Sequence, residues 1–403
     1  MAGSTPSGIT RRVVPFIDLS RLMVRLRADV LSAWTDCLDK CELVGGPRVA
    51  AVEEKLATAL GVPIVVACAS GTDALRVALQ ALGVKRGMKV ALPNLTFWAT
   101  FEAVAQLGAI PVLVDIDPDD LHVDLDELVT AHERHRFDAL IMVHLFGWTS
   151  ARLAEIRAFC KERDVALVED GAQCFGVEAF GEPILAGAGM ATLSFHPAKV
   201  IGGAMDGGAI TMQSKEHEVF LRSVCNHGRS DHYSHAHVGW SSRMGGLQAA
   251  FLSRTLDEVP SVLKCRRATA TFYRERLGAG STKSRVRVFG PPAGVVENGY
   301  LNVLTVAGKR GQEVVDRLEA AGIGARRTYP ATMDAQPPAR AAGAILHGDL
   351  RHSKAFCESV VNLPLFYGMR DDEREAAVSA LSAIATATRF VLPDGVQSSD
   401  DWV

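Results

Sequence analysis

Long apolar runs, a strong charge of one sign and paired cysteines are what this sequence lacks. No apolar stretch approaches the roughly 20 residues that span a bilayer, and the N-terminus has no apolar signal core. The formal net charge is −3, which argues against nucleic-acid binding because phosphate contacts demand a basic surface. The eight cysteines occur singly and form no CxxC pair. We therefore expect a cytoplasmic protein that binds neither a membrane nor nucleic acid.

Two familiar binding patterns are missing as well. Four histidines lie within residues 227–237, but their spacing fits no zinc template and no cysteine stands beside them. We expect a polar surface loop there and no metal site. No GxGxxG turn follows the first expected strand at 64–67, which disfavours a nicotinamide-dependent enzyme.

What the sequence does contain is an alternation of strand and helix patterns. With 403 residues, 48% of them apolar, the chain is long enough for two domains. Short apolar runs alternate with segments of helical periodicity, which predicts an α/β fold with a large, doubly wound and mostly parallel sheet. The runs expected to be strands are 64–67, 90–93, 111–115, 139–143, 165–168, 191–193 and 301–306.

The chain divides by texture near residue 255. We predict a large domain at 13–255 and a smaller C-terminal α+β domain at 256–390. Residues 281–292 are rich in Gly, Pro and basic side chains and are expected to form a loop. The ends, 1–12 and 391–403, are expected to be flexible tails.

Helical periodicity marks the segments between and around these strands. Apolar residues recur at helical spacing from Ser20 to about Lys40, and Pro47 opens a second helix that runs to about Leu60. The other expected helices are 74–82, one opening at 96–100, 125–132, 151–163, 311–321 and 371–386.

Asp170 and Lys199 are the strongest pair of candidate functional residues. Asp170 ends the apolar run 165–168, and Lys199 follows the run 191–193 by a few residues in a Gly-rich surround. In parallel α/β proteins, ligands bind at the carboxyl ends of strands. A pyridoxal phosphate enzyme requires a Lys amine that bonds the cofactor aldehyde and an Asp that keeps its pyridine nitrogen protonated. Either residue alone would be read as an ordinary surface group, but together they favour this cofactor.

A possible phosphate site precedes them in the chain. The expected strand at 64–67 leads through Ser70-Gly71-Thr72-Asp73 into a helix. Free backbone N–H groups at the positive end of a helix suit a phosphate. The alternative is a plain helix cap, in which Ser or Thr only starts the helix.

Three motifs together resemble one enzyme family. Residues 170–173 (DGAQ), 194–199 (SFHPAK) and 206–209 (DGGA) are similar to the signature of the DegT/DnrJ/EryC1/StrS sugar aminotransferases. The resemblance extends from about Val14 to about Leu381. It implies a fold type I, pyridoxal phosphate-dependent enzyme that acts on keto sugars, usually nucleotide-linked, as a homodimer.

The resemblance also implies roles for particular residues. Lys199 would be the catalytic residue, Asp170 would contact the ring nitrogen, and Gln173 would contact the phenolic oxygen of the cofactor. Gly71, Thr72 and Ser194 would hold the phosphate, and Phe97 would stack on the ring.

Two segments match the family less completely. Residues 239–244 (GWSSRM) resemble a segment whose Asn reaches the partner subunit's cofactor phosphate, and here that position is Ser241. The resemblance places His227 and Arg243 of this region near the dimer's active site. Tyr329 matches a Tyr-Pro pair that relatives precede with His, where this chain has Thr328. Tyr329 either lines the substrate site or packs under Pro330.

The predicted function is transfer of an amino group from glutamate or glutamine to a 3- or 4-keto sugar, in amino sugar biosynthesis for a glycan or a glycosylated natural product. Lys199 would first hold the cofactor and then act as the general base. Two alternatives remain open. Some relatives dehydrate sugars, one group with His in place of the Lys, and a relative could also be a non-catalytic regulator. The presence of Lys199, Asp170, Gln173 and Ser194 counts against both.

Overall fold

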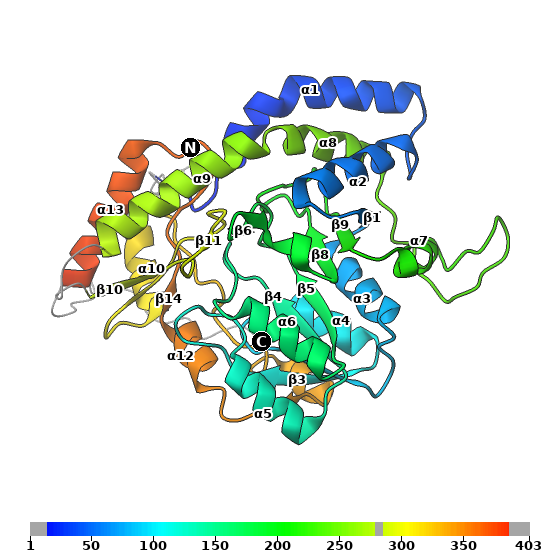
Figure 1. Cartoon of the computed structure of the whole chain (residues 1–403). Coiled ribbons are helices and arrows are strands. Elements are labelled where there is room, and N and C mark those ends of the chain that lie inside the picture. Colours follow the sequence, from blue (N-terminus) through cyan, green and yellow to red (C-terminus); the bar gives the residue numbers. More distant parts are fainter. Residues whose placement is uncertain (1–13, 279–284, 387–403) are drawn as a thin grey trace, which may run out of the picture.

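The architecture is built on one large sheet flanked by helices (Figure 1). The computed structural model describes residues 14–278 and 285–386. The predicted tails 1–12 and 391–403 lie outside these ranges. The eight strands of the sheet, in spatial order, are β1 (Ile64–Cys68), β9 (Gly208–Met212), β8 (Met190–Ser194), β5 (Ala166–Asp170), β4 (Ala139–Val143), β2 (Lys89–Pro93), β3 (Ile110–Val114) and β13 (Ile345–Leu346).

Strand direction agrees with the predicted mostly parallel sheet. From β8 to β13 every neighbouring pair is parallel, whereas β9 runs antiparallel to both β1 and β8. The carboxyl ends of β1, β5 and β8 therefore meet at one edge of the sheet, where Cys68, Asp170 and Ser194 stand.

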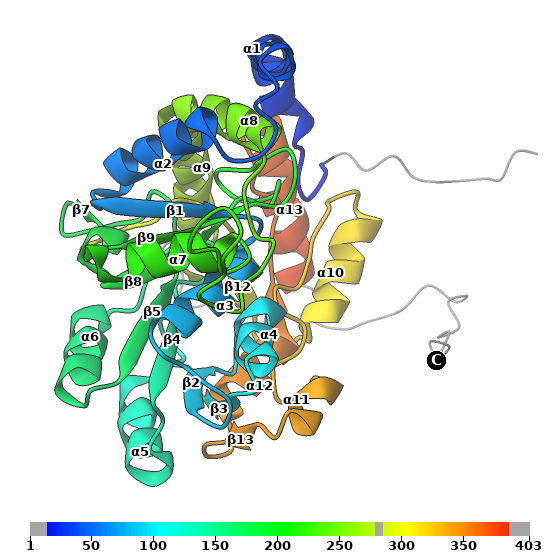
Figure 2. The same cartoon turned by 90° about the vertical axis from the view of Figure 1, so that its right-hand side faces the viewer.

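Helices cover both faces of this sheet, because side chains of a strand alternate between faces and both sets here are apolar (Figure 2). Val90 and Leu92 pack in one buried cluster, and Ala91 between them packs in another. One face is covered by α3 (Gly71–Ala81), α4 (Trp98–Gln106) and α7 (Glu218–Cys225); the other by α2 (Pro47–Leu60), α5 (Leu125–His135), α6 (Leu153–Glu162) and α8 (Gly246–Asp257).

A second, smaller sheet lies in the C-terminal part of the chain. It is antiparallel and consists of β10 (Val286–Phe289), β12 (Val303–Val306) and β14 (Val360–Val361). Its own apolar core involves α9 (Val259–Tyr273), α10 (Gly311–Ala320) and α13 (Asp371–Thr386). The remaining elements are α1 (Ser20–Asp39), α11 (Pro337–Ala341), α12 (Arg351–Ser359), β6 (Glu178–Ala179), β7 (Glu182–Pro183), β11 (Val295–Val296), two 3-10 turns (Ile184–Gly187 and Lys215–His217) and a π turn (Arg274–Gly278).

The two sheets are tied together by segments distant in sequence. Val14, at the start of the described chain, pairs with Ile323 beside the small sheet. Conversely, β13 follows the small-sheet strands β10 and β12 in the chain but pairs with β3 of the large sheet. The division at about residue 255, between α8 and α9, stays a prediction.

The predicted element positions are mostly confirmed, with shifts that have local causes. The helix expected from Ala74 begins at Gly71, because the Ser70 hydroxyl accepts a hydrogen bond from the Asp73 N–H and caps it. The predicted loop at 281–292 is wrong where β10 lies, since β10 pairs with β12 along its whole length. In the described ranges no helix combines the length and apolarity needed to cross a membrane.

Candidate active site

One cavity lies at the edge where β1, β5 and β8 end. Its volume is about 590 Å³, and it is bounded by the strand ends, the first turns of α3 and α4, and the segments around residues 300 and 329. Nearly all of the predicted cofactor residues line it. They are Gly71, Thr72, Phe97, Asp170, Gln173, Ser194 and Lys199, together with Tyr329.

The start of α3 faces the cavity in a form suited to an anion. Ser70 is the N-cap, so the first N–H groups of the helix have no partner within it. Gly71 cannot be replaced by a larger residue without a shift, because an added Cβ would lie 2.7 Å from Ser194 Cβ. The bare backbone of Gly71 and the hydroxyl of Ser194 therefore share one small space. This cradle fits a phosphate group.

Asp170 is the buried carboxylate of the cavity. Its side chain accepts hydrogen bonds from the Ala172 N–H at 3.1 Å and the Thr100 hydroxyl at 3.2 Å. Burial raises the pKa of Asp170, and the Ala172 hydrogen bond and the charge of Lys199 only partly oppose this. The carboxylate thus lacks a close cation, which a protonated pyridine nitrogen would supply. Thr100, which the sequence analysis missed, is buried and also bonds Thr96 at 2.8 Å.

Glu169, the preceding residue, lies on the opposite face of β5 and is fully paired. Arg157 of α6 donates to its two oxygens at 2.7 and 2.8 Å, and His144 Nε2 lies 3.0 Å from Oε2. Burial alone would raise the pKa of Glu169, but the hydrogen bonds from His144 and Arg157 outweigh it and lower the pKa. His144 Nδ1 lies 2.8 Å from the Thr149 hydroxyl. His144 is therefore a buried residue with both ring nitrogens in contact with partners.

Lys199 projects into the cavity from the turn after β8. Its Nζ donates a hydrogen bond to Tyr300 Oη at 3.3 Å and lies 5.1 Å from the centre of the Tyr300 ring. Tyr300 was not predicted from the sequence. It lies about 100 residues further along the chain, in no motif that we could identify, and only the tertiary fold brings it to Lys199.

Gln173 and two aromatic rings form another wall. Gln173 Oε1 accepts the Phe146 N–H at 2.6 Å, and Nε2 donates to the Tyr329 hydroxyl at 2.9 Å. Burial raises the pKa of Tyr329. The Phe97 ring is 56% exposed and lies 6.1 Å from the Tyr329 ring, which leaves its face free for a flat ligand. Trp98 instead stacks on Phe101 at 4.7 Å and packs against the apolar core.

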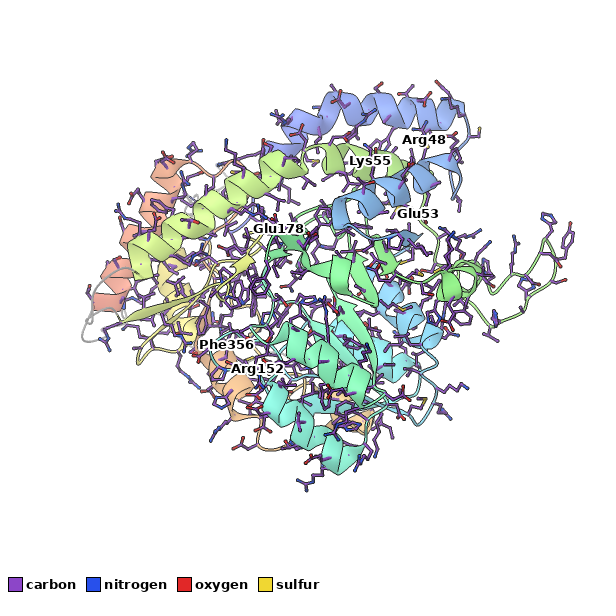
Figure 3. The ribbon with its side chains drawn as sticks, viewed as in Figure 1. Arg48, Glu53, Lys55, Arg152, Glu178 and Phe356 are labelled. Atoms are coloured by element: carbon purple, nitrogen blue, oxygen red, sulfur yellow. The ribbon has the colours of Figure 1, made fainter. Side chains whose placement is uncertain are left out.

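Three predicted residues, His227, Ser241 and Arg243, do not line this cavity. They lie on the segment 226–243, which follows α7 and extends away from the body of the molecule (Figure 1). Its base is fixed: Arg222 of α7 pairs with Glu53 of α2 (labelled in Figure 3), and Ser242 donates to Asp73 at 2.7 Å. The Ser241 backbone pairs with Asn226, and the Ser241 side chain is exposed.

The cavity holds few charges. Among the described residues that line it, Lys199 is the only lysine and there is no arginine. The other ionisable groups are Asp170, Asp206, His196 and the two tyrosines. In the part of the chain that the structure describes, no cluster of three or more His, Cys, Asp or Glu could hold a metal ion.

The residues present therefore fit pyridoxal phosphate. The α3 cradle suits its phosphate, the under-paired Asp170 suits a protonated ring nitrogen, and the Lys199 amine lies in the same cavity.

Comparison with known proteins gives independent findings. A sequence model of the DegT/DnrJ/EryC1/StrS aminotransferase family matches residues 25–382. The UDP-2-acetamido-2-deoxy-3-oxo-D-glucuronate aminotransferase of Pseudomonas aeruginosa is 33% identical over 325 residues, which are 81% of this chain and 88% of the relative. The dTDP-3-amino-3,4,6-trideoxy-alpha-D-glucose transaminase of Streptomyces venezuelae is 32% identical over 372 residues, 92% of this chain and 95% of the relative.

A solved structure extends the likeness to three dimensions. The crystal structure of NtdA from Bacillus subtilis, with the bound cofactor PMP, superposes with a TM-score of 0.84 at 26% identity. The match covers 94% of this chain and 86% of that one.

Proposed function

The chain belongs to the DegT/DnrJ/EryC1/StrS aminotransferase family, and from this premise we propose that it transfers an amino group from glutamate or glutamine to a nucleotide-linked keto sugar. The observation that carries the proposal is the convergence of three unlike groups on one cavity. They are the α3 N-terminus, the buried Asp170 and the amine of Lys199. The keto sugar is supported by the names of the relatives, which act on UDP- and dTDP-linked 3-amino or 3-oxo sugars.

Each part of the cavity has a task toward pyridoxal phosphate. Gly71, Thr72 and Ser194 bind the phosphate, Gln173 orients the ring, and Phe97 covers its face. When bound, the cofactor supplies an electron sink for the carbon that gains or loses the amino group. Asp170 keeps the ring nitrogen protonated, because a carboxylate buried beside a cation is stabilised in its charged form.

Lys199 moves the protons. Its Nζ anchors the cofactor between turnovers and is released when an amino substrate takes its place. The freed Nζ then accepts the proton from the Cα of the amino donor and later returns a proton to the sugar carbon. Strand ends bound the cavity on one side and the Phe97 and Tyr329 rings lie on another, and a ligand stacked on Phe97 would reduce the access of water to that proton.

The test is a half-reaction without sugar. Glutamate or glutamine alone should change the absorbance of the bound cofactor and release one keto acid per site. Borohydride reduction before the donor is added should attach the cofactor to the peptide that contains Lys199. If neither donor changes the absorbance of the bound cofactor, the result would favour the dehydratase or the regulator. If borohydride attaches the cofactor to another lysine, the assignment of the site to Lys199 would be wrong.

We further propose a homodimer with shared active sites. A nucleotide-linked sugar carries a diphosphate, and among the described residues that line the cavity Lys199 is the only lysine or arginine. The segment 226–243 carries the exposed side chains of His227, Arg229, Arg243 and Ser241, and the Ser241 hydroxyl could donate one hydrogen bond to a phosphate. In the dimer these groups would complete the cavity of the partner.

An exposed apolar stripe supports the same dimer. Val24, Leu31 and Leu38 recur every seven residues along α1 and are 81%, 49% and 56% exposed. The stripe continues into Leu43 and Val44, which are 49% and 60% exposed. A seven-residue apolar repeat on one helix face is typical of helix packing between chains.

Complementation tests the shared site. Inactive Lys199→Ala mixed with an inactive Arg243→Glu variant should form heterodimers with one intact site. Recovery of up to about a quarter of normal activity is expected from random pairing of subunits. A monomer in solution, or no recovery after confirmed subunit exchange, would contradict the proposal.

We also propose a cytoplasmic location. All eight cysteines are free thiols and most of them are buried, which suits a reducing compartment. Cell fractionation would test this directly.

A further inference from the structure

Tyr300 is the feature of the cavity that neither motif nor family resemblance assigned. Its hydroxyl is the only hydrogen-bond partner of Lys199 Nζ within residues 14–278 and 285–386, at 3.3 Å. Its ring also faces the amine, with 5.1 Å between Nζ and the ring centre. Asp170, the nearby carboxylate, makes no hydrogen bond to Nζ and acts on it only through space.

The backbone of Tyr300 is held from two sides. Its N–H donates to Asn298 Oδ1 at 2.8 Å, and its carbonyl accepts from Arg266 Nη2 at 2.9 Å. Arg266 Nε donates to the neighbouring Gly299 carbonyl at 3.0 Å. Asn298 is itself fixed by donating to the Gln173 and Phe175 carbonyls at 2.8 and 3.0 Å. Tyr300 is thus connected to the Gln173 wall of the same cavity.

Arg266 is an unusual support. It comes from α9, is 6% exposed, and donates to the backbone carbonyls of Gly299 and Tyr300. Burial lowers the pKa of Arg266 to about 10, so the guanidinium stays charged near neutral pH. A buried cation without a carboxylate is costly, and its position here serves to hold the turn that carries Tyr300.

A close approach at Gly147 shows how tightly this turn is packed. A Cβ on Gly147 would lie 2.2 Å from Asn298 Oδ1 and 2.9 Å from the Tyr300 backbone nitrogen. The Gly147 carbonyl accepts the Asn298 N–H at 3.0 Å, which locks the two turns together. The Tyr300 ring therefore has little freedom to move from Lys199.

We propose that Tyr300 is a positioning residue, which holds the Lys199 amine in reach of the reacting carbon while that amine is not bonded to the cofactor. A phenol hydroxyl can accept a hydrogen bond from an ammonium and donate one to a neutral amine. The contact can therefore persist through both protonation states of Lys199 Nζ. Arg266 acts one step further away, by fixing Tyr300. The inference rests on the proposed function, in which Lys199 carries the cofactor.

Tyr300→Phe isolates the hydroxyl, because the ring and its packing remain. The limiting rate of the donor half-reaction should fall by about 10- to 100-fold, within the range for a misplaced catalytic base. The half-saturating donor concentration should change by less than about threefold, since the hydroxyl would serve the proton transfer step and not binding. Tyr273→Phe is the matched control: Tyr273 is a buried tyrosine whose hydroxyl donates to the Pro364 carbonyl, away from the cavity.

A second readout does not depend on turnover. Apo-protein mixed with pyridoxal phosphate should acquire borohydride-reducible cofactor on Lys199 about 10-fold more slowly in Tyr300→Phe than in the wild type. The final amount bound should be equal, because the phosphate cradle and Asp170 are intact. Equal capture rates and equal half-reaction rates in a folded Tyr300→Phe protein would overturn the proposal.

Arg266→Lys tests the support. A lysine lacks the two separate nitrogens with which Arg266 donates to the Gly299 and Tyr300 carbonyls, so capture should slow as well. If Arg266 acts through Tyr300, the double variant should be no slower than Tyr300→Phe alone. If the rate losses of the two single variants add up in the double variant, Arg266 does not act through Tyr300. Failure of the wild type to capture the cofactor at Lys199 would instead refute the proposed function itself.

Discussion

Glu169 and Asp170 are consecutive carboxylates at the end of β5, and their surroundings are opposite. Glu169 faces α6, where Arg157 and His144 satisfy both of its oxygens and lower its pKa. Asp170 faces the cavity, where only a backbone N–H and a hydroxyl reach it and burial raises its pKa. On the helix side of this strand, the charge of the carboxylate is balanced by a cation. On the cavity side, the carboxylate has no hydrogen bond from a cationic side chain among the described residues, which leaves room for a positively charged ligand atom. Stability and function are therefore separated by the pleat of a single strand.

Among the cavity variants, Lys199→Ala should show the largest loss of activity. Turnover should fall by at least about 10³-fold, because the anchor and the proton carrier are lost together. Thermal stability should stay near that of the wild type, since Nζ makes one hydrogen bond to the described residues, the bond to Tyr300. Lys161→Ala, on the exposed side of α6, is the control and should keep full activity. Residual turnover within 10-fold of the wild type would show that Lys199 is not the base.

Asp170→Asn should lower the activity but leave the stability of the apo-protein unchanged or higher. The half-reaction should slow by about 10²- to 10³-fold, because a neutral amide no longer stabilises a protonated ring nitrogen. The folded-state pKa of Asp170 is raised, so this group stabilises the fold while protonated and loses that contribution as pH rises. At neutral pH the apo-form of Asp170→Asn should therefore melt at or above the wild-type temperature, and the advantage should shrink in acid. Calorimetry of the apo-proteins at several pH values measures this, and a lower melting temperature at neutral pH would contradict it.

Arg157→Met should damage the helix side instead. Removing Arg157 leaves the buried Glu169 without its guanidinium partner and with His144 as its remaining contact, which should cost about 3 kcal/mol of unfolding free energy. The folded-state pKa of Glu169 is lowered, so its stabilising contribution is present above the usual carboxyl range and is lost as pH falls. The unfolding curves of variant and wild type should therefore converge in acid. Arg163→Met, at the exposed position directly after the last residue of α6, is the control for denaturant titrations.

The smallest expected effect is that of Thr149→Val. The change conserves shape but removes the hydroxyl that lies 2.8 Å from His144 Nδ1. A buried ring nitrogen left without a partner costs about 1–2 kcal/mol. Activity at saturating substrate should stay within about twofold of the wild type, because this contact lies on the helix side. Loss of activity without loss of stability would contradict the view that the helix side contributes to stability and the cavity side to function.

Asp170 and Lys199 of the cavity could be predicted from local sequence, whereas Tyr300 and the helix-side residues could not. Asp170 ends an apolar run, and Lys199 follows another within a few residues, so a short stretch already indicates their chemistry. Arg157 is one charged residue on an amphipathic helix, and nothing near it in sequence indicates Glu169 as its partner. The pair exists because α6 packs across the end of β5.

In the fold, too, elements that depend on local sequence were predicted and elements that depend on distant parts of the chain were not. Strands with continuous apolar runs, such as β4 and β5, were predicted closely because burial on both faces dictates such runs. The two-residue strand β13 left no such signal, since its pairing with β3 depends on a distant part of the chain. Tyr300 escaped prediction for the same reason: its role depends on the packing of α9 and of the Gly147 turn.

The chain passes back and forth between the large and the small C-terminal sheet, and this limits where the protein can be divided into stable fragments. A fragment that ends at residue 255 would lose β13 from the edge of the large sheet, and Val14 would lose its partner Ile323. The exposed edge of β3 would then be open to pairing with other chains. A protease that nicks the α8–α9 junction should therefore release no stable half, and the nicked halves should stay together under native conditions. For the purposes of expression and crystallisation, we expect the large and the small sheet to be best kept in one polypeptide.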